Sequence, residues 1–226
     1  MTARAEPPAE DPPAPLGPRF PGYDVLSQQE TWDDVTKGVV LGRLGPTPPI
    51  RFFTPEEEAV VRPLVDRLLG MDGDPRVAVV ERLDSKLTEQ IGPGYRHDDM
   101  PEPWEAWRAS LAAVDDDARA AHGVPFADLD PDRQRRLLED IRTHDGNWHG
   151  LPAAKVWTLW MDDVCTIFYS HPSAWNEIGY GGPAYPRGYS RHTLLSTREP
   201  WEAAEADAMD PVPWAQRVEE ARRRQS

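Results

Sequence analysis

The sequence lacks several features that would assign it to a common functional class. It has a single cysteine, Cys165, so no internal disulfide can form, and the apolar neighbours of this residue predict a buried, inert thiol. No stretch approaches the roughly 20 apolar residues of a membrane span, so membrane insertion is not expected. Residues 1–20 hold neither a twin-arginine pair nor an apolar run, and we therefore expect a cytoplasmic protein.

Basic residues are also scarce. The chain has 25 Lys and Arg against 39 Asp and Glu, which gives a formal net charge of −14. A nucleic-acid binder needs a basic face, and an anionic membrane surface would repel this charge. The acidity is typical of a soluble protein, although an acidic docking role is an alternative.

Motifs that mark enzymes are missing. The turn Gly179–Gly182 does not have the spacing of a dinucleotide-binding loop after a strand, and no Walker, GxSxG, HExxH, CxxC or EF-hand sequence is present. We therefore expect no catalytic, cofactor-binding or metal-binding residues in this chain. The pattern favours a binding protein over an enzyme.

Histidines leave one catalytic alternative open. His144, His149 and His171, together with Glu177, could assemble a metal site from distant segments, which would make the chain an independent metal-dependent enzyme. A separation of five residues does not place His144 and His149 on one helical face, and the glycine between them indicates a loop. Loop histidines that only form hydrogen bonds are more common.

Acidic clusters favour structural roles. Asp115, Asp116 and Asp117 are adjacent on an expected helix, so their carboxylates diverge and should form a solvated face. Asp162 and Asp163 flank the apolar stripe of another helix, and we expect one of them to pair with an arginine.

Hydrophobic periodicity predicts an all-α fold of about five helices. The first begins with a capping box at Thr54 and Glu57, ends at Gly70, and is expected to kink or break at Pro63. Asp130 should cap the fourth helix. The other helices are expected over 77–89, 104–121 and 153–169.

Composition divides the chain into four parts. Proline is frequent at the start and apolar residues are rare there, which predicts a disordered arm. Two weak helical patterns, around Trp201 and around 214–222, occur near the end. The predicted parts are the arm at 1–19, an ordered lead-in at 20–53, the helical domain at 54–192 and a tail at 193–226.

The segment 171–189 is rich in glycine and proline, yet it contains more aromatic residues than an ordinary loop. It is either a loop folded back as a plug over the protein itself or a rigid docking surface, since Tyr, Trp and Arg dominate the energy of interfaces. Pro183 and Pro186 should hold the backbone extended and present Tyr185 and Arg187 outward. The predicted partner-binding residues are Trp175, Asn176, Glu177, Tyr180, Tyr185, Arg187 and Tyr189, with Trp32 in the lead-in.

Three stretches resemble the gluconate 2-dehydrogenase subunit 3 family. They are 52–57 (FFTPEE), 123–129 (GVPFADL, followed by a glutamine-bearing helix) and 168–189, in which WNEIGYGGP is the most specific part. The resemblance covers about 50–192. It implies an all-α small subunit of a hetero-oligomer, without catalytic residues of its own.

The resemblance also implies a partner. It is a large flavoprotein of the glucose-methanol-choline type, which holds FAD and oxidises an alcohol or sugar hydroxyl. Exported members carry a twin-arginine signal and pass electrons to a cytochrome, whereas this chain lacks the signal. The expected function is therefore to dock onto, and stabilise or mature, a cytoplasmic flavoenzyme. A transient chaperone of such an enzyme, or a flavin-free oxidoreductase, is an alternative.

Overall fold

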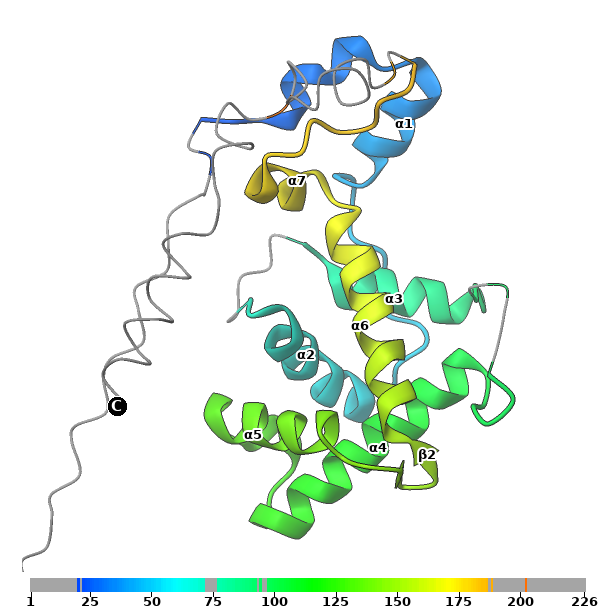
Figure 1. Ribbon diagram of the computed structural model, residues 1–226, viewed down its shortest axis with the longest axis vertical. Helices are drawn as coiled ribbons and strands as arrows, with labels where there is room; N and C mark the ends of the chain where they lie inside the picture. The colour runs from blue at the N-terminus through cyan, green and yellow to red at the C-terminus, as the bar shows by residue number, and fades with distance from the viewer. Residues whose placement is uncertain are drawn as a thin grey trace, which may run out of the picture. The chain divides into compact units, whose positions relative to one another are not determined.

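The computed structural model describes residues 20, 22–71, 77–92, 94, 97–186, 188 and 202 (Figure 1). Helices dominate these residues, which confirms the all-α class. Contacts divide the chain into two compact units. One is Gly38–Ala174, and the other consists of the described residues up to Lys37 and from Trp175 onward. The predicted arm at 1–19 and both predicted tail helices lie outside the described residues.

The helical elements follow the predicted order, with additions at both ends. The strands form a two-stranded antiparallel ladder with Trp148 opposite Leu151. Residues 34–42 of the lead-in form a helix that the sequence pattern did not predict. The elements are η1 (Val25–Thr31), α1 (Asp34–Gly42), α2 (Pro55–Leu69), α3 (Val79–Thr88), α4 (Pro103–His122), η2 (Phe126–Asp128), α5 (Pro131–Arg142), β1 (Asn147–Trp148), β2 (Leu151–Pro152), α6 (Ala153–Tyr169) and α7 (Pro172–Ile178).

Helix α2 begins with the predicted capping box. The Thr54 hydroxyl accepts the Glu57 amide at 3.2 Å, and the Glu57 carboxylate accepts the Thr54 amide at 2.8 Å. Gly70 ends the helix in the left-handed conformation, as expected. The helix runs through Pro63 without a break, so of the two predicted outcomes the division into two helices is wrong. Packing of the flanking buried Val61 and Leu64 offsets the hydrogen bond that proline cannot donate.

Helix α6 lies among the other helices of the Gly38–Ala174 unit (Figure 1), and it contacts α2, α3, α4 and α5. Its bounds agree with the predicted 153–169. Indole rings fill the centre of this unit. Trp160 is fully buried beside Trp107 and Trp148, and its Nε1 donates to Ser110 Oγ at 3.0 Å. The indole N–H of Trp160 therefore has a hydrogen-bond acceptor inside the core.

The acidic run of α4 is not a purely solvated face, which corrects the prediction. Asp115 Oδ1 accepts the Phe126 amide at 2.8 Å. Asp117 accepts Trp148 Nε1 at 2.7 Å, and of the three acids only Asp116 is exposed. Adjacent carboxylates do diverge, but the segments that follow α4 and α5 donate hydrogen bonds to two of them.

Across the ranges that the structure describes, no helix combines the length and the apolarity needed to cross a bilayer.

Candidate functional site

The predicted docking segment folds back on the lead-in, and the contacts between them are here called the joint. It begins with a contact between two aromatic rings. The Trp175 and Tyr180 rings meet edge to face, with centroids 5.6 Å apart and planes at 85°. The Tyr180 amide donates to the Trp175 carbonyl at 2.9 Å, which closes the turn after α7. Trp175 is 5% exposed, so almost all of its surface is used by the chain itself.

Hydrogen bonds join this turn to the lead-in. Asn176 Oδ1 accepts the Val25 amide at 2.8 Å, and the Tyr23 hydroxyl donates to the Tyr180 carbonyl at 2.9 Å. Asn176 Nδ2 also lies 3.4 Å from Asp24 Oδ1. Residues more than 150 positions apart in the chain thus form one unit.

Trp32 completes the joint. Its buried indole packs over Gly182, where an added Cβ would lie 2.8 Å from Trp32 Cζ2 and 3.1 Å from Val25 Cγ2. Gly182 also has φ +74°, a conformation that favours glycine. Trp32, Trp175, Asn176 and Tyr180 therefore have internal roles, as in the plug interpretation.

The rest of the predicted surface lies further along the chain. Tyr185 is 66% exposed and available to a partner, whereas Glu177 is half-buried. Arg187 and Tyr189 lie outside the described residues. Tyr185 and Pro186, joined by a cis peptide bond, form a turn instead of the predicted extended chain. The docking role of these residues stays a prediction.

A buried charge pair lies between α3 and α6. Asp163 is 5% exposed, accepts Trp107 Nε1 at 2.9 Å and forms an ion pair with Lys86. The sequence predicted an arginine partner for this pair of acids, and the structure places a lysine there instead. Each oxygen of this carboxylate has an internal partner, which gives Asp163 a structural role between three helices.

Beside this pair lies a pocket of ≈ 360 Å³, here called the Asp162 pocket. Its lining combines apolar and charged side chains. Lys155 pairs with Asp99, while Asp162 has no ion-pair or hydrogen-bond partner among the described residues. The apolar lining residues are Met100, Pro101, Pro103, Ala106, Ala154 and Leu159, and the polar ones are Lys86, His97, Lys155, Thr158, Asp162 and Asp163.

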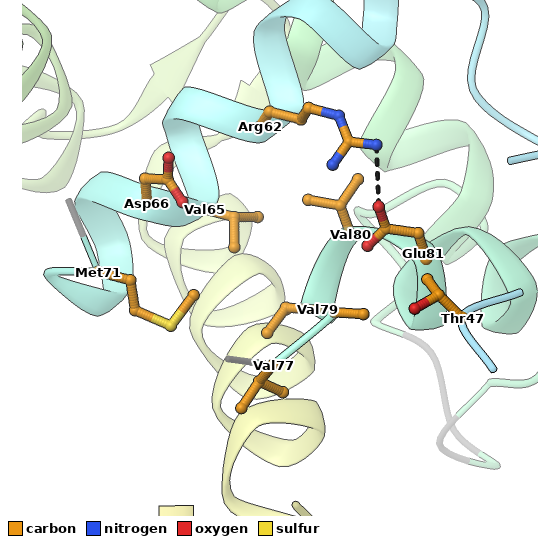
Figure 2. Close-up of a pocket in the computed structure, with 10 residues that line it drawn as sticks. Thr47, Arg62, Val65, Asp66, Met71, Val77, Val79, Val80 and Glu81 are labelled. Atoms are coloured by element: carbon orange, nitrogen blue, oxygen red, sulfur yellow. Dashed lines mark hydrogen bonds and ion pairs between the residues drawn. The ribbon is translucent and has the colours of Figure 1, made fainter. Parts of the chain in front are cut away.

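Figure 2 shows a second hollow, of ≈ 270 Å³, between α2 and the start of α3. Val65 and Val79 point into it, and the dashed line marks the pair between Arg62 and Glu81. Arg62 Nη2 lies 2.9 Å from Glu81 and 2.6 Å from Glu58. One guanidinium is thus held by two carboxylates, so all three charged groups are engaged with one another.

Residues 55–182 match the family described as Gluconate 2-dehydrogenase subunit 3. The match covers more than half of the chain. This chain belongs to the gluconate 2-dehydrogenase subunit 3 family. No curated protein and no solved structure was found to match it. The matched region begins at the first residue of α2 and ends at Gly182, the glycine that packs against Trp32.

The stretches that carry the resemblance to the subunit 3 family build the fold. The backbone before α2 is held by the buried Asp84, whose carboxylate accepts the amides of Arg51, Phe52 and Phe53 at 2.8, 2.8 and 3.0 Å. Its hydrogen bonds start α2 at a fixed position against α3. The only sequence signal for this role is an acid on an apolar helix face.

The second stretch is also structural. The Phe126 ring is fully buried, and its carbonyl accepts the side-chain amide of Gln134 at 3.0 Å. Gln134 is the glutamine of the helix that follows GVPFADL, and it is itself buried. The turn is thereby fixed at both its N–H, by Asp115, and its carbonyl.

The histidines of the metal alternative have separate environments. His149 Nε2 lies 2.7 Å from Asp117 Oδ1, near the start of α6, and His171 follows the end of that helix. A helix of 17 residues spans about 25 Å, too far for both imidazoles to bind one ion. Among the described residues, no group of three or more His, Cys, Asp or Glu side chains could hold a metal.

Cys165 is half-buried, less than predicted. Burial raises the pKa of its thiol, and the charge of Asp162 raises it further. The thiol therefore stays protonated at neutral pH and is a weak nucleophile, in keeping with the inert role expected from the sequence.

Proposed function

We propose that this chain is an accessory subunit that docks onto an FAD-dependent oxidoreductase of the glucose-methanol-choline type. The partner would oxidise an alcohol or sugar hydroxyl, and the small subunit would stabilise or mature it. The observation that carries this proposal is the family match over 55–182. A member of a dehydrogenase-subunit family is expected to act in a hetero-oligomer.

FAD then belongs to the partner. The sequence has no glycine-rich turn between a strand and a helix to cradle a dinucleotide pyrophosphate. The conspicuous acids have structural partners, since Asp84 binds backbone amides, Asp163 binds Lys86 and Asp117 binds Trp148. These contacts support an accessory role over catalysis by this chain.

Co-expression tests the proposal. The full chain, carrying an affinity tag, is produced with the glucose-methanol-choline flavoprotein of the same organism and purified by size exclusion. We expect one peak that contains both proteins and the absorbance of bound flavin. A second flavoprotein of the same superfamily, from an unrelated organism, serves as the control and should elute separately.

The same preparation decides between a subunit and a transient chaperone. A permanent subunit stays bound when the complex is diluted and run again, whereas a chaperone leaves a folded, active flavoprotein behind. If the flavoprotein folds, binds FAD and turns over normally without ever binding this chain, the proposal is wrong.

A further inference from the structure

Among the described residues, the Asp162 pocket has one carboxylate without a partner. Lys86 is bound to Asp163 and Lys155 is bound to Asp99, so both lysines of the lining are already paired. Asp162 is an exposed carboxylate of the lining, and no described residue forms an ion pair or hydrogen bond with it. The described acids and lysines of the pocket and its pairs therefore carry one excess negative charge, which favours a cationic ligand.

The apolar part of the lining adds a second requirement. Met100 and Ala106 are buried, and Leu159 and two prolines also contribute apolar surface. A volume of ≈ 360 Å³ lies at the small end of the range for ligand pockets. A group that fits both features has a short apolar stem and a cationic head.

On the basis of the proposed function, we infer that the Asp162 pocket is a docking site for an arginine side chain of the flavoprotein. The methylene stem of arginine lies along Met100 and Leu159, and its guanidinium meets the Asp162 carboxylate. Arginine fits better than lysine because its planar guanidinium can donate two parallel hydrogen bonds to one carboxylate. Arginine is also enriched at the residues that dominate binding energy.

Two substitutions on α6 test this site without disturbing the core. Asp162→Asn removes the charge and keeps the shape. Thr158→Arg places the chain's own guanidinium one helical turn from Asp162, where it satisfies the carboxylate and blocks the mouth. Each is expected to weaken the complex with the flavoprotein at least about tenfold in Kd, measured by titration calorimetry at constant salt.

Helix α4 supplies a matched pair of controls. Ala112 and Asp116 are exposed, have the same spacing of four residues, and do not line the pocket. Asp116→Asn and Ala112→Arg change the net charge by the same amount as the two test variants. We expect both controls to bind within about twofold of the unsubstituted chain.

The outcomes separate this inference from the proposed function. If the unsubstituted chain does not bind the flavoprotein, the proposed function is wrong and the arginine site is wrong with it. If it binds and the α6 variants bind equally tightly, the pocket lies outside the interface and only the arginine site is wrong. Equal weakening by the α6 and α4 variants would also overturn it, because bulk charge would then explain the effect.

A cross-link identifies the occupant directly. A photoreactive phenylalanine analogue at the exposed position 166, one helical turn beyond Asp162 and outside the pocket lining, should join the flavoprotein within the complex, and mass spectrometry should locate the cross-link next to an arginine. A cross-link to a surface without arginine would contradict the assignment.

Discussion

Trp107 Nε1 donates to Asp163 Oδ2 at 2.9 Å, while the other oxygen of the same carboxylate accepts a hydrogen bond from the Lys86 ammonium. One side chain of α6 thus ties α4 and α3 to the centre of the helical unit. Asp163 is buried, and it stands beside the exposed Asp162. Neighbouring acids therefore have different roles, one in folding and one at a pocket.

Asp163→Ala should lower the free energy of unfolding by about 2–3 kcal/mol. The change leaves the Lys86 ammonium and the Trp107 N–H without an acceptor, and the partial exposure of Lys86 keeps the effect below that of a fully buried pair. Urea denaturation measures it. Asp162→Ala is the control and should change stability by less than about 0.5 kcal/mol. Equal losses in the two variants would show that the buried pair contributes nothing.

Asp84→Ala should destabilise the fold by about 3 kcal/mol, because three backbone amides lose their acceptor together. Hydrogen exchange gives a local measurement, and the Phe53 amide should exchange much faster than in the parent. Amides in the middle of α5 serve as an internal reference. An unchanged rate at Phe53 would mean that water replaces the carboxylate at no cost.

Local signals in the sequence predicted the helices well. The capping box at Thr54 and the apolar stripe of α6 depend on neighbours within a few residues, so the pattern alone determines them. Asp84 and Asp163 depend on partners 31 to 77 positions away, which no short window contains. The helix α1 was missed because its apolar residues, such as the exposed Val35 and Val39, do not form a buried stripe.

The candidate site was harder to predict for the same reason. Aromatic composition singles out 171–189, but it does not reveal whether a ring faces a partner or the chain itself. Trp175 and Trp32 are buried by contacts with segments far away in the sequence, whereas Tyr185 is exposed. The Asp162 pocket is built from α3, α4, α6 and the loop before α4, and no single motif marks it.

His171 should make stability depend on pH. Burial lowers the pKa of its imidazole below the ordinary value, and the charge of Arg82 lowers it further. The ring Nδ1 accepts the Ser173 amide, which also requires the neutral form. The unfolded chain therefore binds more protons below about pH 6.5, so stability is complete above that pH and falls as pH decreases toward the folded pKa.

His171→Asn tests this dependence, since the asparagine oxygen can still accept the Ser173 amide. Between pH 7.5 and 5.5 the parent should lose more stability than His171→Asn in urea titrations. His144→Asn, at an exposed position, should follow the parent. If His171→Asn shows the same pH dependence as the parent, another group is responsible.

Gly182→Ala should loosen the joint between the lead-in and the segment after α7. Its Cβ would overlap the Trp32 ring, whereas Gly188→Ala, at the same φ of +74°, would meet no atom of the described residues within 4 Å. Both substitutions strain the backbone equally, so their difference isolates the clash. Gly182→Ala alone should increase exchange at the Val25 amide, which Asn176 binds. Similar exchange in the two variants would mean that Trp32 moves aside easily.

Of the predicted docking residues that the structure describes, Tyr185 has the largest exposed fraction, at 66%. If the proposed complex forms, replacing Tyr185 and Arg187 together by alanine should weaken it by at least about 2 kcal/mol, or roughly thirtyfold in Kd. Trp175 is a poorer probe because it is buried, and its loss would disturb the fold. Circular dichroism and the melting temperature of the free subunit should not change.

The control for this prediction is Tyr169→Ala, which removes a half-exposed tyrosine from α6. That variant should bind with nearly the affinity of the parent. The Tyr185 and Arg187 changes are then combined with Asp162→Asn. If the two surfaces act independently, their losses of binding free energy add, and a departure from additivity shows that they are coupled. A complex that survives the Tyr185 and Arg187 changes but not Asp162→Asn would place the interface on α6 and leave 171–189 as an internal plug.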